Sequence, residues 1–508
     1  MTRALGAALL MLCACGGKPP LPSDFMWGAS IAGFQVDMGC PTLPAAECED
    51  RGSDWYQLIT NPRGFMAVQS SVTFQPPTHG PGHWELWEQD FDRAKNDLAL
   101  DSFRLSLEWS RIFPTSTEGI TGYDALKAHA SQAALERYHA MFAGLKARGV
   151  KPLVTLNHYS LPLWIHDALA CHTDLDTCTN KGWLDPPRIQ AEIAKYAGFV
   201  AKEFGGEVDL WATENEPFAV VLPGYIFPSS ERVNPPALSY KFAEAKVAMT
   251  AMIVAHARMY DAVKENDTVD ADADGKPAQV GLVYATVPMR PKDPAKPLDK
   301  KAAENVFYLY NTVFLDGVCK GDLDAELSGK AVHRDDLANR MDWIGINYYT
   351  PLTITGTMTA SFPTLSPLSN FDPFALMGST WVDDPKGLYE MAMHLKDRYG
   401  LPLIVTENGT AVEGLDDAEK ASSFLVRHVT WLQRAARDGA DVRGYFYWTL
   451  IDNYEWNHGM DIRMGLWAVD PMDVTKARAK RPAVDAYRQI IDANQVPAAL
   501  DQQWPSPE

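Results

Sequence analysis

Residues 401–406 read Leu-Pro-Leu-Ile-Val-Thr, an almost unbroken apolar run followed directly by Glu407 and Asn408. A strand that is apolar on both faces is typical of a parallel sheet covered on both sides. Seven other segments have a strand-like character, and several of them are also nearly continuous apolar runs. They are Phe25–Gly33, Ser102–Trp109, Lys151–Asn157, Val208–Thr213, Gln279–Val287, Trp343–Tyr348 and Arg443–Leu450. The sequence therefore predicts eight strands, most of them buried.

Most of these strands are separated by stretches with helical periodicity, of which Ala133–Arg148, Ile189–Phe204 and Ala421–Arg437 are examples. Eight strand–helix units predict an α/β fold, a single (β/α)8 TIM barrel. Such a barrel usually has about 250 residues, so much of this chain must form loop insertions. The candidate insertions are Gly39–Pro81, Thr117–Gln132, Ala170–Pro187, Lys264–Lys276 and Thr355–Asp384.

No internal repeat and no linker marks a second domain, so we assign residues 23–495 to one catalytic domain and 496–508 to a C-terminal tail. The 508 residues are 46% hydrophobic and 22% charged, which is enough apolar material for a large core. The formal net charge of −19 repels phosphate backbones, which argues against a nucleic-acid partner. The oligomeric state is left open.

The N-terminus has the features of an export signal. Arg3 precedes the apolar stretch Ala4–Leu12, which is too short to span a bilayer but suits the core of a signal peptide. Leu12-Cys13-Ala14-Cys15 resembles a bacterial lipobox with Cys15 as the acylated residue. We predict a signal peptide with lipobox at 1–15, a tether at 16–22, and a lipid anchor that is the only membrane contact. The protein is then exported to the bacterial cell envelope, in the periplasm or at the outer membrane or cell surface. An ordinary signal peptide is the alternative.

Cysteine spacing predicts two short-range disulfides. Cys40 lies close to Cys48, and Cys171 lies close to Cys178, each pair within a polar loop. An exported chain meets an oxidising compartment, where such pairs form disulfides. Cys319 has no evident partner.

Polar residues follow several of the predicted strands. In a (β/α)8 barrel the carboxyl ends of the strands form the floor of the active site. Two of these residues, Glu216 and Glu407, are carboxylates on the fourth and seventh strands, and paired carboxylates are the requirement of glycoside hydrolysis. In chain order the positions are Gln35, Arg104, His158, Glu216, Asn347, Tyr349, Glu407 and Trp448.

Several motifs resemble those of family 1 of the glycoside hydrolases. Thr213–Pro217 (Thr-Glu-Asn-Glu-Pro) is similar to the acid/base motif of that family, and Val405–Gly409 (Val-Thr-Glu-Asn-Gly) to its nucleophile motif. Trp448–Trp456 resembles a late motif, and Gly28–Gln35 looks most like the archaeal-type β-glycosidases. The resemblance runs from about residue 21 to residue 494. It implies a retaining, exo-acting enzyme for terminal β-D-glucosides, with galactosides and fucosides as further candidates.

The resemblance also implies a role for each matching residue. Glu216 would be the acid/base and Glu407 the nucleophile, with Arg104 and Tyr349 orienting the nucleophile and Trp448 stacking on the sugar. No cofactor is implied, and the twelve histidines lack the spacing of a catalytic metal site. The residues implied to bind the substrate are Gln35, His158, Asn215, Asn347, Tyr349, Trp448, Glu455 and Trp456.

The sequence departs from the family pattern at a few positions. Asp37 stands where Glu is usual, and Met464 stands where an aromatic residue is usual near the 6-hydroxyl. Glu214 stands where an apolar residue is commoner; its carboxylate would either repel the negative charge of Glu216 or join a salt bridge. The two cysteine pairs are insertions outside the ordinary pattern.

The expected mechanism is double displacement, in which Glu407 attacks the anomeric carbon while Glu216 protonates the leaving oxygen. Arg104 would keep Glu407 ionised. A 6-phospho-β-glycosidase is an alternative that the negative charge of Glu455 disfavours. A transglycosidase would use the same residues and is distinguished by product analysis with alcohol acceptors. A non-catalytic sugar-binding lipoprotein would be expected to lack one of the two carboxylates.

The lipobox predicts covalent lipid on Cys15. Cells fed a radioactive fatty acid should label the wild-type protein, whereas the Cys15→Ser variant should remain unlabelled because the acylated thiol is gone. A Cys15→Ser protein that still carries label would refute the assignment.

Overall fold

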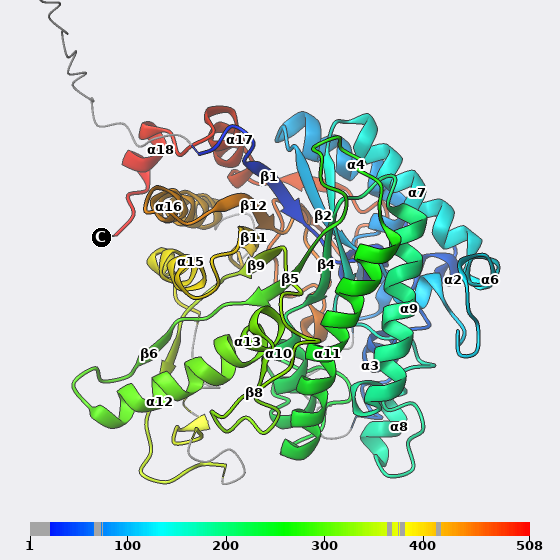
Figure 1. Cartoon of the computed structure of the whole chain (residues 1–508). Helices are drawn as coiled ribbons and strands as arrows, with labels where there is room; N and C mark the ends of the chain where they lie inside the picture. Colours follow the sequence, from blue (N-terminus) through cyan, green and yellow to red (C-terminus); the bar gives the residue numbers. More distant parts are fainter. Residues whose placement is uncertain are drawn as a thin grey trace, which may run out of the picture.

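The computed structural model describes residues 21–65, 73, 75–362, 368–373, 375, 381–412 and 418–507. Eight parallel strands close into a barrel in the order β1, β12, β11, β9, β5, β4, β3, β2 (Figure 1). The predicted (β/α)8 barrel is confirmed. The strands are β1 (Met26–Ser30), β2 (Ser102–Ser106), β3 (Lys151–Asn157), β4 (Leu210–Asn215), β5 (Gln279–Ala285), β9 (Trp343–Asn347), β11 (Leu403–Asn408) and β12 (Val442–Trp448).

A layer of side chains fills the interior of the barrel, each from a different strand. Gly28 of β1 faces this layer, and a Cβ atom there would lie 2.2 Å from Cδ1 of Phe446, so only glycine fits. This packed layer gives the polar strand ends a rigid floor. Its members are Leu153, Ala212, Val283, Trp343, Ile404 and Phe446.

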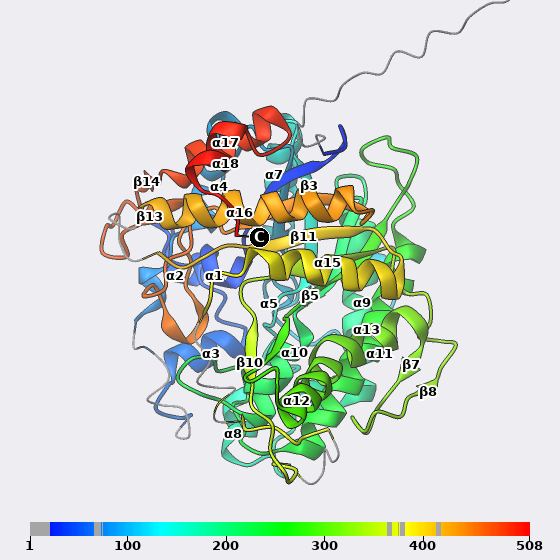
Figure 2. The ribbon, with the colours of Figure 1, turned by 90° about the vertical axis from the view of Figure 1, so that its left-hand side faces the viewer.

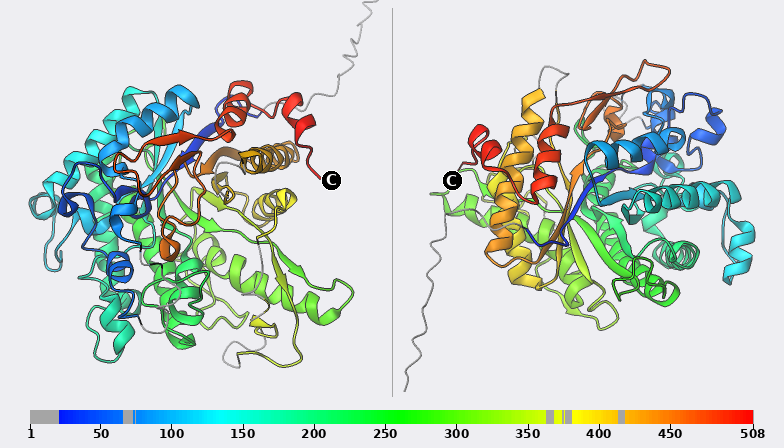
Figure 3. Two further views of the ribbon diagram at one scale, coloured as in Figure 1. Left: turned by 180° about the vertical axis from the view of Figure 1, so that it is seen from behind. Right: turned by 90° about the horizontal axis from the view of Figure 1, so that it is seen from above.

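Helices surround the strands, as the view from above shows (Figure 3). The three helices predicted from periodicity are found within three residues of their expected ends, as α7, α9 and α16. The principal helices are α4 (His83–Asp92), α7 (Gln132–Ala147), α9 (Pro186–Phe204), α11 (Phe242–Asn266), α13 (Val313–Lys320), α15 (Pro385–Tyr399), α16 (Ala418–Arg437) and α17 (Ala483–Ala493).

Helix α15 illustrates how local sequence sets these bounds. The side chain of Asp384 accepts a hydrogen bond from the backbone N–H of Gly387, which satisfies an otherwise unpaired helix donor, and Pro385 occupies the first turn. The helix stops at Gly400, whose φ of +66° is readily adopted only by glycine.

Several of the segments between the barrel strands gather at one end of the barrel. Helices α3 (Asp54–Thr60), α8 (Ala168–Thr173) and α12 (Pro297–Phe307) lie there in two perpendicular views, whereas α17 lies at the other end (Figures 1 and 2).

No helix of the described residues is long and apolar enough to cross a membrane. The remaining short elements are α1 (Gly33–Asp37), α2 (Ala45–Cys48), α5 (Trp109–Ile112), α6 (Tyr123–His129), α10 (Pro217–Val221), η2 (Pro77–His79), η3 (Arg93–Asp97), η4 (Gly182–Leu184), η5 (Leu222–Ile226), η6 (Tyr308–Thr312), η8 (Trp456–His458) and the strand pairs β6 (Met289–Pro291) with β10 (Leu352–Ile354), β7 (Asp322–Leu323) with β8 (Val332–His333), and β13 (Trp467–Val469) with β14 (Arg478–Lys480).

The structure contains the disulfides Cys40–Cys48 and Cys171–Cys178, each closing a loop within an insertion. Cys319 is free in the described part of the chain.

The folded domain is longer than 23–495 at both ends. Leu21, which we placed in the tether at 16–22, is buried, and its N–H donates to the carbonyl of Asn494. The predicted tail at 496–508 carries helix α18 (Ala498–Gln503), whose Leu500 is buried. An apolar residue near each boundary therefore packs on the domain. The signal peptide and Cys15 lie outside the described residues.

Glu214 in the barrel wall is fully buried, and neither of its carboxyl oxygens has a hydrogen-bond partner in the described structure. The salt bridge that the sequence left open for it is therefore not formed there. Burial raises the pKa of Glu214 well above its ordinary value, because a charge in this site would have no compensation.

A raised carboxyl pKa makes the folded state bind more protons than the unfolded state, so stability falls as pH rises above the unfolded pKa. The Glu214→Gln variant cannot ionise. It should melt close to wild type at pH 4.5 and at a higher temperature at pH 8, because each pH unit adds up to about 1.4 kcal/mol to the difference. Calorimetry at several pH values measures this, with the exposed Glu304→Gln as control. A constant difference between wild type and Glu214→Gln would contradict it.

Candidate active site

The two predicted carboxylates lie at the carboxyl ends of β4 and β11, and a chain of hydrogen bonds links them. Arg104 donates from Nη1 to Oε1 of Glu407 (2.6 Å) and from Nη2 to Oδ1 of Asn215 (2.7 Å). Nδ2 of Asn347 lies 3.2 Å from the same Asn215 oxygen and 2.8 Å from Oε1 of Glu216. Both carboxylates are buried, and Glu216 is among the charges that act on Glu407. The two acids therefore belong to one site.

The backbone around Glu216 adopts conformations that non-glycine residues rarely adopt. Glu216 itself has φ +45° at the N-cap of α10, Tyr159 has +72° and Trp456 has +50°. Each such residue costs of order 1 kcal/mol and persists only where its surroundings hold it. Strain of this kind concentrates at functional sites, and here it involves three residues that lie together.

Several neighbouring groups shift the pKa of Glu407 in opposite directions. Burial raises its pKa to about 7, and the neighbouring Glu216 acts in the same direction, whereas the charge of Arg104 and the hydroxyl of Tyr349 lower it. Tyr349 donates to Oε2 of Glu407 at 2.6 Å, and Arg104 pairs with Oε1. Arg104 therefore favours the ionised form of Glu407, Tyr349 acts in the same direction, and burial opposes both.

Two residues that were not singled out from the sequence complete the surroundings of Glu216. The hydroxyl of Tyr159 makes a short hydrogen bond to Oε2 of Glu216, and Nη2 of Arg232 lies 3.3 Å from that hydroxyl. Tyr159 directly follows His158 at a strand end, so this position in the sequence could have identified it as a candidate site residue. Arg232 lies in a loop between η5 and α11, where nothing in the sequence indicates a role.

Several buried polar atoms at the site have no partner in the described structure. They include Oε1 of Gln35, Nδ1 of His158 and Oδ1 of Asn453. Nε2 of His158 faces Nδ2 of Asn215 at 3.2 Å and so accepts, which leaves a proton on Nδ1. Burial also lowers the pKa of His158 well below its ordinary value, so the ring is neutral. Since buried polar atoms are normally paired, these atoms suit a polar ligand.

Glu455 lies beside Gln35. Nε2 of Gln35 donates to Oε2 of Glu455 at 3.0 Å, Nδ2 of Asn453 donates to the same oxygen at 2.8 Å, and Nη1 of Arg232 reaches Oε1 at 3.2 Å. The carboxylate is therefore ion-paired and oriented from three sides.

Aromatic rings line the same region. Trp448 packs against Met464, and Trp456 stacks on Phe34 with the two rings nearly parallel. Tyr349 contacts Trp381, whose side chain is exposed, at a ring-centroid distance of 5.3 Å. Flat rings beside polar groups are the combination that sugar rings require.

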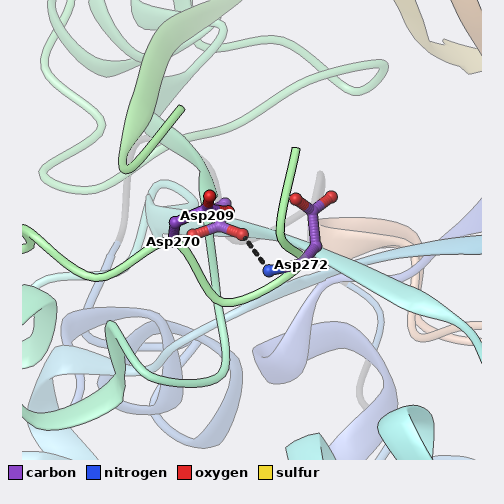
Figure 4. A group of neighbouring side chains, drawn as sticks. All are labelled: Asp209, Asp270 and Asp272. Carbon is purple, nitrogen blue, oxygen red and sulfur yellow. Dashed lines mark hydrogen bonds between the residues drawn. The ribbon is translucent and has the colours of Figure 1, made fainter. Parts of the chain in front are cut away.

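The described residues include one group of acids close enough to share a cation, Asp209, Asp270 and Asp272 (Figure 4). Oδ2 of Asp209 accepts from the backbone N–H of Asp272 at 2.8 Å. Asp209 immediately precedes β4, so this group lies at the opposite end of that strand from Glu216 and has no part in the site.

Two buried acids at the carboxyl ends of strands in a (β/α)8 barrel are the arrangement that glycoside hydrolysis requires. The sequence model "Glycosyl hydrolase family 1" matches residues 18–496. A β-galactosidase of Pyrococcus woesei is 33% identical, over 95% of this chain and 99% of that protein. The crystal structure of a β-glycosidase from Thermosphaera aggregans has a TM-score of 0.79 at 31% identity, covering 96% of this chain and 100% of that one. A Pyrococcus furiosus β-glucosidase structure has a TM-score of 0.77 at 31% identity, covering 96% and 99%. The chain belongs to glycosyl hydrolase family 1.

The Tyr349 hydroxyl favours the ionised form of Glu407, so its removal should raise the pKa of Glu407 above the value of about 7. A carboxylate that acts as a nucleophile must be ionised, which is the role expected of Glu407 from the sequence. The acid limb of kcat/KM should therefore move to higher pH in Tyr349→Phe, by roughly half to one unit. The control is Tyr348→Phe, because that hydroxyl donates to the carbonyl of Asp384 outside the site. An unmoved acid limb in Tyr349→Phe would show that the hydrogen bond does not tune Glu407.

Proposed function

We propose that this protein is a retaining, exo-acting β-glycosidase that hydrolyses terminal β-D-glucosides, with Glu407 as nucleophile and Glu216 as acid/base. The observation that supports it best is the different hydrogen bonding of the two carboxylates within one linked network. Glu407 accepts from Arg104 and Tyr349, whereas Glu216 is bonded to neutral partners, Asn347 and Tyr159. A cation beside only one acid favours the division into nucleophile and proton donor.

In the first step Glu407 forms a bond to the anomeric carbon, the glycosidic C–O bond breaks, and the proton of Glu216 passes to the leaving oxygen. In the second step Glu216 takes a proton from water, the water oxygen bonds to the anomeric carbon, and Glu407 leaves. In this proposal Asn215, which Arg104 and Asn347 hold, binds the 2-hydroxyl, a contact that strengthens in the transition state.

The proposed sugar site consists of Gln35, His158, Glu455, Trp448 and Trp456. The unpaired atoms of Gln35 and His158 supply an acceptor and a donor for adjacent hydroxyls. Relatives of this chain are named for glucosidase and for galactosidase activity. Glucose and galactose differ only in the configuration of one hydroxyl group. We propose β-glucosides as the preferred substrates and β-galactosides as the next candidates.

The electrostatic argument against a phosphorylated sugar needs revision. The sequence predicts that the negative charge of Glu455 repels a phosphate group. Glu455 forms an ion pair with Arg232, however, and the positive charge of Arg232 weakens that repulsion. Glycoside 6-phosphates therefore belong among the test substrates.

We also propose that the protein is exported and lipid-anchored through Cys15. The support is the lipobox-like sequence and the two cysteine pairs, which suit an oxidising compartment.

The test combines substrates and variants. Wild type should release the β-anomer first from nitrophenyl β-glucoside, as read by NMR, and should prefer β-glucosides in a panel of β-glycosides and their 6-phosphates. Glu407→Gly should lose hydrolysis by more than about a thousandfold, yet couple an α-glucosyl fluoride to an acceptor. Glu216→Ala should lose far more activity on poor leaving groups than on dinitrophenolate, because only poor leaving groups need the proton.

The control is Glu192→Ala, since Glu192 is a buried acid paired with Lys195 away from the site. Inversion of configuration, or unchanged turnover by Glu407→Gly, would reject the proposed mechanism.

A further inference from the structure

The loop that connects η5 to α11 is attached to the segment that carries the proposed sugar-binding residues. The N–H of Val233 donates to Oδ1 of Asn457, Nδ2 of Asn457 donates to the carbonyl of Ser230, and Nε2 of His458 donates to the carbonyl of Glu231. Three interactions with η8 thus fix the loop on both sides of Arg232, so the position of this arginine relative to Glu455 is determined by the fold.

Arg232 contacts two functional groups at once. Its Nη1 lies 3.2 Å from Oε1 of Glu455 and its Nη2 lies 3.3 Å from the hydroxyl of Tyr159. The guanidinium carbon lies 5.7 Å from the centre of the Tyr159 ring. The Arg232 side chain is 34% exposed, so it borders solvent and the two buried groups together.

We propose that Arg232 is a positioning residue that orients Glu455 for the terminal sugar and, through Tyr159, stabilises the ionised carboxylate of Glu216. This inference rests on the proposed function, because it assigns Glu455 to the sugar and Glu216 to proton transfer.

The first part follows from the hydrogen bonds of Glu455. Oε2 accepts from Gln35 and Asn453, whereas among the described residues Arg232 is the partner of Oε1. Without Arg232 the Oε1 side of a carboxylate with only 12% side-chain exposure loses its cation, and the group is free to rotate toward solvent. Sugar hydroxyls that bind Glu455 would then meet a less ordered partner, which raises KM.

The second part of the proposal follows from the contacts that connect Arg232 to Glu216 through Tyr159. The Tyr159 hydroxyl donates to Glu216, and a cation next to its oxygen makes the phenol a stronger donor. Donation to a carboxylate favours the ionised form. That form is produced when Glu216 protonates the leaving group and is required when Glu216 activates water. The charged and titratable groups that face Glu216 are Tyr159, Arg232, Tyr284, Tyr310, Tyr349 and Glu407.

The test compares Arg232→Met and Arg232→Lys with wild type and with a matched control, Arg290→Met. Arg290 is an arginine of similar exposure (40%) that joins Asp384 to Glu390 away from the site. Active-site titration with a 2-fluoro-glucoside counts correctly folded enzyme in each preparation, which removes the effect of any loss in folding.

Arg232→Met should raise KM for nitrophenyl β-glucoside by about five- to tenfold, and less for the β-xyloside, which lacks the C6 hydroxymethyl group. The alkaline limb of kcat/KM should move to higher pH by roughly half to one unit for both substrates, because removal of a cation makes the acid/base harder to deprotonate. Arg232→Lys should restore the limb, and Arg290→Met should change neither quantity.

A wild-type protein that hydrolyses no β-glycoside would reject the proposed function itself. An active wild type whose Arg232→Met variant keeps both its alkaline limb and its KM would reject only the role of Arg232. A lower titrated fraction with unchanged kinetics per site would show a purely structural arginine and would also reject that role.

Discussion

The buried guanidinium of Arg104 is the interaction on which the site depends. Its side chain is fully buried on β2 and reaches three other strands, with Nε donating to Thr155 of β3, Nη1 to Glu407 of β11 and Nη2 to Asn215 of β4. A buried cation without a partner is strongly destabilising, so the barrel requires an anion opposite it. Glu407 supplies that anion. The same contact therefore serves the packing of the barrel interior and the orientation of the proposed nucleophile.

The rest of the site balances charge within a desolvated space. Three acids, Glu216, Glu407 and Glu455, face two arginines, Arg104 and Arg232, and each arginine pairs with one acid. Glu216 is the acid left without a cation in direct contact among the described groups, and it is bonded instead to Tyr159 and Asn347. The two arginines therefore distinguish Glu216 from the other two acids, and this difference is the basis of the proposed division of roles.

The fold and most of the site could be predicted because both depend on local patterns. Apolar runs mark the buried strands, and the polar residues that follow them meet at one rim because parallel strands end together. Glu216, Glu407, Asn347 and Tyr349 are reached in this way. Arg232 could not be predicted, since it lies in an irregular loop whose position depends on contacts with η8. The isolation of Glu214 and the packing of Leu21 and Leu500 likewise depend on neighbours distant in sequence.

Leu21, where the described chain begins, is hydrogen-bonded to Asn494 just beyond α17, near the start of β1. Helices α17 and α18 lie at the opposite end of the barrel from α3, α8 and α12 (Figures 1 and 2). Glu216 and Glu407 lie at the carboxyl ends of β4 and β11. In a molecule tethered by its N-terminus, as we propose, the membrane would adjoin the end of the barrel opposite the candidate active site. The candidate active site would then face the aqueous side, so a soluble saccharide could enter and leave without passing between protein and lipid.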